Sequence, residues 1–235
     1  MGRIFEKRKH KIFARMDKMA KAFTKIGKEI AMAVKSGGAD PHNNPRLRVA
    51  IQNAKAVNMP KDRVDAAIKR AVSKDESNYE EMVYEGYGPY GVAVLVEAAT
   101  DNPTRTIANV RLHFSKGGGT VGKSGSLDFM FTRKAVFQID PSGMDRDELE
   151  LAMIDMGADD IVDDEGMVFV YAPFTSFGSM QKLLEEGNYK VISSELERIP
   201  NSFAEVTEEQ EEEVMKLVER LEEDDDVQNV FHNMK

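Results

Sequence analysis

The sequence of 235 residues contains no cysteine and no tryptophan, and only 8% of its residues are aromatic. Without cysteine the chain can form no disulfide, thiolate metal site or cysteine nucleophile, so nothing in it points to an oxidising compartment. Long apolar runs are also missing, since the stretch VAVLV ending at Val96 is far shorter than the ~18 residues of a membrane-spanning helix. The first residues, MGRIFEKRKHK, are charged where a signal peptide is apolar. These absences predict a cytoplasmic protein with no membrane partner.

Charge is abundant but unevenly distributed. The chain has 32 Lys and Arg against 41 Asp and Glu, a net charge of -9. Residues 1–74 hold 19 of the basic and six of the acidic residues, which leaves 13 basic and 35 acidic residues in the remainder. Such an asymmetry indicates a module that binds nucleic acid, attached to an acidic and solubilising body.

Residues 1–75 are predicted to form a basic three-helix domain. Apolar residues recur at alternating intervals of four and three from Ile12 to Ile30, which is typical of an amphipathic helix that ends at the Ser-Gly-Gly of residues 36–38. Basic residues follow the same rhythm one position earlier and form a second face. Asn44 before Pro45 predicts the start of a second helix, and Pro60 that of a third.

The rest of the chain is predicted to be α/β. Valine- and aromatic-rich runs indicate strands at residues 79–85, 92–98, 126–131 and 135–139, with a helix at 104–116 between the second and third. From residue 135 to 200 the order is strand, helix, strand, strand, helix, strand, the βαββαβ arrangement of ferredoxin-like units. A last helix begins at Thr207, where Thr207 and Gln210 match a capping box, and a strand at 227–231 follows it.

The predicted fold class is therefore α+β, an N-terminal three-helix domain followed by two α/β domains, with the ferredoxin-like unit inserted into the other. The domains are expected at residues 1–75, at 76–133 with 202–235, and at 134–201 for the insertion.

Candidate contacts to nucleic acid are Lys and Arg residues on the helices of residues 1–75, because such side chains neutralise backbone phosphates. A charged helix face usually serves only solvation, but here about three basic residues accompany each acidic one, which favours binding. The predicted contacts are Lys7, Arg8, Lys9, Lys11, Arg15, Lys18, Lys25, Lys28, Arg46, Arg48, Lys61, Arg63, Lys69 and Arg70.

Two glycine motifs invite an enzymatic interpretation. Residues 117–124, GGGTVGKS, match a phosphate loop, but such a loop follows a strand and opens a helix, whereas here a helix precedes it and a strand is expected after it. Gly86, Gly88 and Gly91 match GxGxxG, yet they separate two strands. The four histidines lack the spacing of metal ligands. A phosphate-loop-like nucleotide-binding enzyme is therefore the distant alternative, and no cofactor, metal or catalytic residue is predicted.

Several longer motifs resemble one family. The segments PRLR, NMPKD, YEGYGP and FSKGG stand in the order and spacing found in the YebC/PmpR family of bacterial proteins, which also includes a mitochondrial translational activator. The resemblance covers nearly the entire chain. It implies a helical N-terminal domain followed by two α/β domains, one inserted in the other. It also implies DNA-binding transcriptional regulation, although other members act on the ribosome and relieve stalls, notably at proline runs.

The chain departs from typical members of that family in two places. They begin with GHSKWxNIKxRK where this chain has MGRIFEKRK, and many carry glycine where this chain has Tyr90. The resulting prediction is a non-enzymatic, DNA-binding transcriptional regulator. The alternative is a translation factor associated with the ribosome or ribosomal RNA, because a continuous basic face suits backbones better than base edges. The acidic body is expected to dock a ribosome or protein partner.

Overall fold

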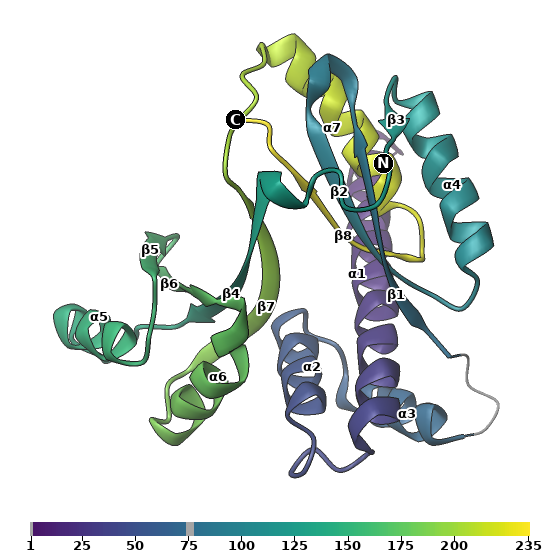
Figure 1. Ribbon diagram of the computed structural model, residues 1–235. Helices are drawn as coiled ribbons and strands as arrows, with labels where there is room; N and C mark the ends of the chain where they lie inside the picture. Colours follow the sequence, from purple (N-terminus) through teal and green to yellow (C-terminus); the bar gives the residue numbers. More distant parts are fainter. Residues whose placement is uncertain (1, 74–77) are drawn as a thin grey trace. The chain divides into compact units, whose positions relative to one another are not determined.

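A computed structural model describes residues 2–73 and 78–235, with side chains from residue 19 onward within those ranges (Figure 1). By its packing the chain divides into two compact units. The first unit comprises Met1–Met82, Val96–His113 and Val218–Val230, and the second comprises Val83–Leu95, Phe114–Leu217 and Phe231–Lys235. No helix in the described ranges is both long and apolar enough to cross a membrane.

Three helices open the chain, as the sequence predicts. They are α1 (Gly2–Gly37), α2 (Pro45–Ala56) and α3 (Lys61–Val72). Gly38, at φ +87°, follows the predicted end of α1 in the left-handed conformation that glycine adopts most easily. Figure 1 shows α2 and α3 beside the C-terminal part of α1. Their shared core includes Ile30, Leu47 and Val64, which are almost fully buried.

The first sheet has the strand order β3-β1-β2-β8. Its strands are β1 (Glu80–Tyr87), β2 (Ala93–Thr100), β3 (Thr120–Val121) and β8 (Val227–His232). Two helices connect to these strands along the chain. The helix α4 (Pro103–Lys116) lies between β2 and β3, and α7 (Glu208–Glu222) precedes β8. The capping box predicted for α7 is confirmed, because Thr207 N donates to Gln210 Oε1 at 3.0 Å and Gln210 N to Thr207 Oγ1 at 3.4 Å.

The strand predicted at residues 126–131 is wrong. Residues Asp128–Met130 form a 3-10 turn, and the segment that pairs with β1 is Thr120–Val121. The physical reason lies in the buried carboxylate of Glu85, which accepts hydrogen bonds from Gly125 N and Leu127 N at 2.7 and 2.5 Å. Backbone donors that bond to this side chain are not available to a neighbouring strand.

The second sheet has the order β5-β6-β4-β7 and confirms the predicted ferredoxin-like unit. Its elements are β4 (Phe131–Ile139), α5 (Arg146–Asp155), β5 (Asp160–Asp164), β6 (Met167–Pro173), α6 (Phe177–Glu186) and β7 (Val191–Pro200). Alternate residues of the central strands, such as Phe137 and Val170, face the same core as Met153 of α5 and Met180 of α6. The exact boundaries of the predicted domains stay a prediction.

Candidate nucleic-acid interface

Four of the predicted phosphate contacts lie on α3 and are exposed. They are Lys61, Arg63, Lys69 and Arg70. Arg63 and Arg70 are seven residues apart, which places both on one side of the helix. The Arg63 guanidinium also lies 5.9 Å from the centroid of the Phe23 ring on α1, within the range of a cation–π contact. No ion pair to Lys61, Lys69 or Arg70 is found among the described side chains.

The two predicted contacts on α2 already have partners within the first unit. Arg46 is exposed but forms an ion pair with Glu81 of β1. Arg48 is half-buried and donates from Nη1 to the carbonyl oxygens of Pro41 and His42, at 3.0 and 3.2 Å. Arg48 therefore holds the connection that leads into α2, and Arg46 is the more accessible of the two.

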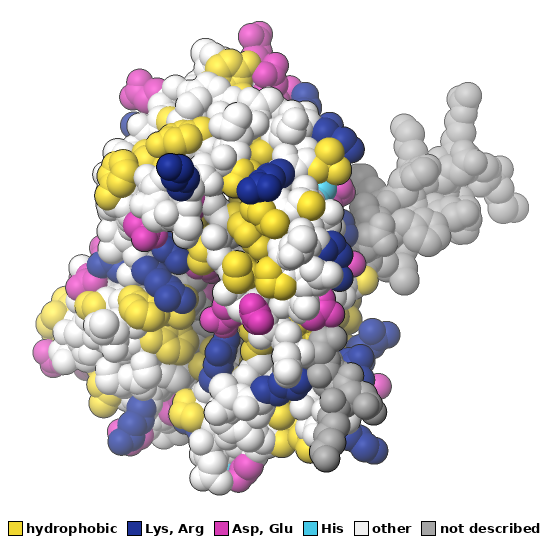
Figure 2. Space-filling model, turned by 45° about the vertical axis from the view of Figure 1, so that its right-hand side comes forward, with side chains coloured by type: hydrophobic (Ala, Val, Ile, Leu, Met, Phe, Trp, Pro, Cys, Tyr) yellow, Lys and Arg dark blue, Asp and Glu magenta, His cyan; other side chains and the backbone are white. Residues whose placement is uncertain are grey.

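The predicted contacts at Lys7, Arg8, Lys9, Lys11, Arg15 and Lys18 lie outside the described side chains. For them the sequence pattern stands as the only observation. On the face seen in Figure 2, the Lys and Arg side chains that can be described are separated by hydrophobic and acidic ones rather than gathered in a single patch.

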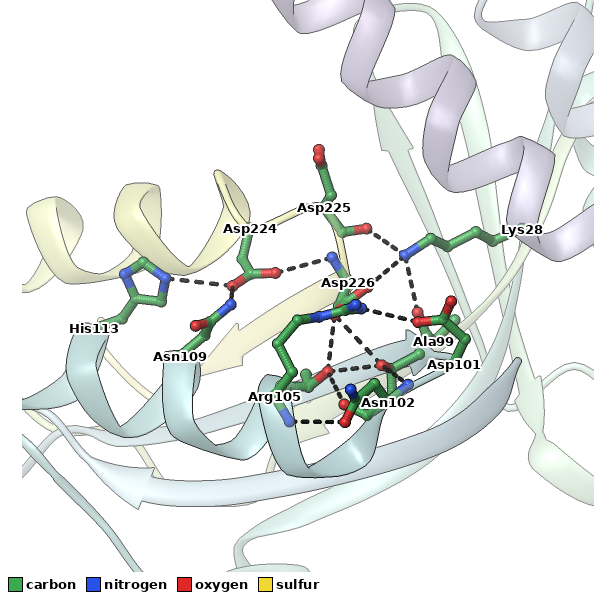
Figure 3. Close-up of polar contacts among 12 residues, drawn as sticks. Lys28, Ala99, Asp101, Asn102, Arg105, Asn109, His113, Asp224, Asp225 and Asp226 are labelled. Atoms are coloured by element: carbon green, nitrogen blue, oxygen red, sulfur yellow. Dashed lines mark hydrogen bonds and ion pairs between the residues drawn. The ribbon is translucent and has the colours of Figure 1, made fainter. Parts of the chain in front are cut away.

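The prediction that Lys28 lies on an exposed basic face of α1 is wrong (Figure 3). The Lys28 side chain is only 9% exposed, and its Nζ donates to Asp226 Oδ1 at 2.8 Å, to the carbonyl of Asp225 at 2.7 Å and to that of Ala99 at 3.0 Å. The reason is tertiary, because the turn between α7 and β8 packs on this side of α1. A buried ammonium that is bonded in this way cannot reach a phosphate.

Lys25 is also engaged, although less completely. It is half-buried, and its Nζ donates to the carbonyl of Gln228 at 2.9 Å. Burial lowers the pKa of the Lys25 ammonium, and the negative charge of Glu222 opposes that effect. The predicted basic face of α1 is thus covered at its C-terminal end, where Lys25 contacts β8 and Lys28 contacts the turn before it.

Asp226 is the centre of this polar network, which lies entirely within the first unit. Its carboxylate is 8% exposed and also accepts from Arg105 Nη2 at 2.7 Å and Thr106 Oγ1 at 2.8 Å. Burial by itself raises the pKa of Asp226, but the hydrogen bonds from Lys28, Arg105 and Thr106 outweigh it and lower the pKa to about 2. The carboxylate is therefore charged at neutral pH.

The neighbouring Asp224 extends the network along α4. Its Oδ2 accepts from Asn109 Nδ2 at 3.1 Å and lies 3.4 Å from His113 Nε2, while its Oδ1 accepts from Asp226 N at 2.9 Å. Asn109 and Asp224 are 115 residues apart, so no local pattern in the sequence predicts this contact. The segment TDNPTRT, residues 100–106, contains Arg105 and Thr106 and was the available signal in the sequence.

The glycine-rich segment 117–125 is a structural connection and does not have the arrangement of a phosphate loop. The helix α4 precedes it, β3 lies within it, and the next α-helix, α5, begins only at Arg146. A Cβ at Gly119 would lie 2.5 Å from the carbonyl oxygen of Tyr87, and one at Gly86 would lie 2.5 Å from that of Thr120. These glycines allow two backbones to approach closely. Gly122 N, moreover, donates to the carbonyl of Glu85 at 2.7 Å.

Tyr90, which departs from the family pattern, adopts a left-handed conformation at φ +61°. Its hydroxyl donates to Glu213 Oε2 at 2.6 Å, a bond that raises the pKa of Tyr90. The bond to α7 offsets part of the cost of a conformation that glycine adopts freely. Among the described residues, no group of three or more His, Asp and Glu side chains is arranged to hold a metal ion.

Comparisons with known proteins cover almost the entire chain. Residues 3–74 match the model of the TACO1/YebC protein N-terminal domain, and residues 79–234 match that of the TACO1/YebC second and third domain. A probable transcriptional regulatory protein of Cytophaga hutchinsonii is 60% identical over 234 residues, covering 100% of this chain and 98% of the relative. One from Parabacteroides distasonis is 56% identical over 236 residues, covering 100% and 97%.

A solved structure is also similar. The conserved hypothetical protein Aq1575 of Aquifex aeolicus superposes with a TM-score of 0.81 and 37% sequence identity, over 92% of this chain and 90% of that one. The two family matches together span both the basic helical segment and the α/β body, so the chain belongs to the TACO1/YebC family.

Proposed function

We propose that this protein is a non-enzymatic, cytoplasmic regulator of gene expression that binds nucleic acid through its N-terminal helices, most specifically a DNA-binding transcriptional regulator. The observation that carries the proposal is the exposed basic group on α3, Lys61, Arg63, Lys69 and Arg70, within a segment that carries 19 basic and six acidic residues. The relatives named above as probable transcriptional regulatory proteins support the same class.

The chemistry of this group suits phosphate backbones. Ammonium and guanidinium groups displace the counterions condensed on nucleic acid, which makes binding strong at low salt and weak at high salt. Of the residues predicted on α1, Lys28 is excluded by its burial and Lys25 by its contact with β8. Arg48 is engaged at the start of α2. The proposed interface therefore consists of the α3 group, Arg46 and the predicted contacts between Lys7 and Lys18. The body, with 35 acidic and 13 basic residues, is assigned to protein docking.

The proposal predicts that reversing charges on α3 weakens binding and makes it depend less on salt. In the full chain, Lys61→Glu, Lys69→Glu and Arg70→Glu together should reduce the slope of log affinity against log salt by up to about three for duplex DNA, roughly one per lost phosphate contact. Arg63 is left intact because it packs on Phe23. Fluorescence anisotropy with a 30-base-pair duplex and with a structured RNA hairpin, over a range of salt concentrations, measures the effect.

The matched control reverses three exposed lysines of the second unit, Lys123, Lys182 and Lys216. It changes the net charge equally and should weaken binding far less. Equal losses in both variants would mean that net charge alone decides binding, and a wild-type chain that binds neither probe at low salt would contradict the proposal.

The same basic group would also serve a translation factor, because it reads backbone charge and not bases. Crosslinking in cells, followed by sequencing of the bound nucleic acid, separates the two. Recovery of DNA supports transcriptional regulation, whereas recovery of almost only ribosomal RNA would replace it with the translational alternative.

A further inference from the structure

The middle of α1, from Lys21 to Lys28, faces a run of five acidic residues, Glu222 to Asp226. The run begins at the last residue of α7. We name this run the acidic turn. Both the acidic turn and the facing part of α1 belong to the first compact unit. A shallow groove between them is lined by Lys21, Thr24 and Lys25 on one side and by Glu222, Asp224 and Asp225 on the other.

In and beside this groove, three successive lysines of α1 contact the acidic turn or β8, the strand that follows it. Lys21 Nζ lies 3.8 Å from Glu223 Oε1, and Lys25 and Lys28 donate to backbone oxygens of Gln228 and Asp225. The three lysines are spaced by four and three residues, so they continue along the helix the rhythm of the basic face that the sequence places at Lys11, Arg15 and Lys18. The acidic turn therefore lies where the basic face would otherwise extend.

The three lysines differ in how deeply they are buried. Lys28 is buried and held by Asp226, so it is part of the folded core of the unit. Lys21 is 40% exposed, and its partner Glu223 is 69% exposed. An ion pair with this exposure contributes little to stability and opens readily. Carboxylates at this position carry the same charge as phosphates and compete with them for the same ammonium groups.

We propose that the acidic turn is an intramolecular competitor that masks Lys21 and Lys25 and so limits the nucleic-acid footprint on α1 to its N-terminal part. This inference rests on the proposed function, since it concerns regulation of the same surface. It explains why an acidic run lies directly beside a basic face. Removing the exposed carboxylates of the turn lengthens the footprint without changing the fold.

The first test neutralises the exposed carboxylates in the full chain, with Glu222→Gln, Glu223→Gln and Asp225→Asn. Asp224 and Asp226 are kept because they bond to α4 and to Lys28. Anisotropy titrations with a 30-base-pair duplex and with an RNA hairpin should show affinity higher by roughly 3- to 10-fold at low salt, and a salt slope steeper by about one to two. Thermal unfolding of each variant verifies that the fold is intact.

The matched control carries Glu209→Gln, Glu211→Gln and Glu212→Gln, in the first half of the same helix. These residues are exposed and lie at least ten residues from Glu222, about 15 Å along the helix axis, which exceeds the Debye length of about 8 Å at physiological salt. The control should change affinity by less than about twofold. An equal gain in both triple variants would overturn the proposal in favour of net charge.

The second test asks whether Lys21 is masked. Lys21→Ala should change the affinity of the wild-type chain by less than about twofold, but should remove much of the gain when it is added to the neutralised variant. If the effects of Lys21→Ala and of the neutralising substitutions on affinity were strictly additive, the proposal that the acidic turn masks Lys21 would be overturned. If the wild type binds and the neutralised variant binds no better, only the masking fails. If neither chain binds either probe, the proposed function fails with it.

Discussion

Polar contacts from several elements of the first unit converge on Asp226. It joins α1, α4 and the start of β8, through Lys28, through Arg105 and Thr106, and through its own backbone. A buried ion pair is weak evidence for net stability, because desolvation of both charges offsets their attraction. Removing one partner is different, since it leaves the other charge buried without compensation.

We therefore predict that Asp226→Asn lowers the free energy of unfolding by roughly 3 kcal/mol at pH 7, because it leaves the Lys28 ammonium without its carboxylate. The folded pKa of Asp226 is about 2, below its usual 3.8, so the stability that its charge contributes is present above pH 3.8 and is lost as the pH falls through about 2. Urea unfolding of wild type and variant between pH 7 and pH 2 measures both effects.

The neighbouring Asp225→Asn provides the control. Lys28 bonds to the backbone oxygen of Asp225, and the Asp225 side chain is exposed, so this change should cost less than about 0.5 kcal/mol at any pH in that range. A stability difference between wild type and Asp226→Asn that does not shrink as the pH falls toward 2 would contradict the role given to the Asp226 charge.

The connection between α1 and α2 depends on Asn44. Its Oδ1 accepts from Leu47 N at 3.1 Å and caps α2, while its Nδ2 donates to the carbonyls of Ala33 and Gly38 at 2.7 and 2.8 Å. A single buried side chain thus satisfies the end of one helix and the beginning of the next.

We predict that Asn44→Ala lowers the free energy of unfolding by roughly 2 to 3 kcal/mol, because it removes the cap of α2 and leaves the carbonyls of Ala33 and Gly38 without their donor. Thr207→Ala removes only an exposed cap from α7 and should cost about 1 kcal/mol. Thermal unfolding compares the two. Equal losses would show that the second role of Asn44 contributes nothing.

The ferredoxin-like unit has its own core, and its two connections to the rest of the chain lie next to each other. Phe131 pairs with Pro200 at the ends of β4 and β7, so the chain enters and leaves the unit at adjacent positions. Its core is supplied by its own strands and by α5 and α6. This arrangement supports the proposal that residues 134–201 are an insertion into the other α/β domain.

We predict that a fragment of residues 130–201 folds by itself, because a core formed within one segment needs no outside partner. Far-ultraviolet circular dichroism with urea titration should show one cooperative transition. Phe137→Asp, which buries a charge in that core, should abolish the transition and serves as the control. A wild-type fragment without a cooperative transition would contradict the predicted domain boundaries.

Much of the secondary structure was predictable from sequence because its signals are local. The apolar spacing of α1, the glycine after it, the Asn44 cap and the Thr207–Gln210 capping box each involve residues at most four positions apart, and the structure confirms them. The βαββαβ order followed in the same way from the alternation of short patterns.

Where charge is concentrated, which segments are helices and which family the motifs resemble can all be read from the amino-acid sequence. Which of the charges are available for binding depends on the packing of segments that are far apart in the chain. Lys28 and Asp226 are 198 residues apart, and Glu85 bonds to an amide 42 residues away, so no local pattern shows that the first pair is buried or that the second contact replaces a predicted strand. Helical periodicity locates the faces of a helix, but only the packing of distant segments determines which face is covered.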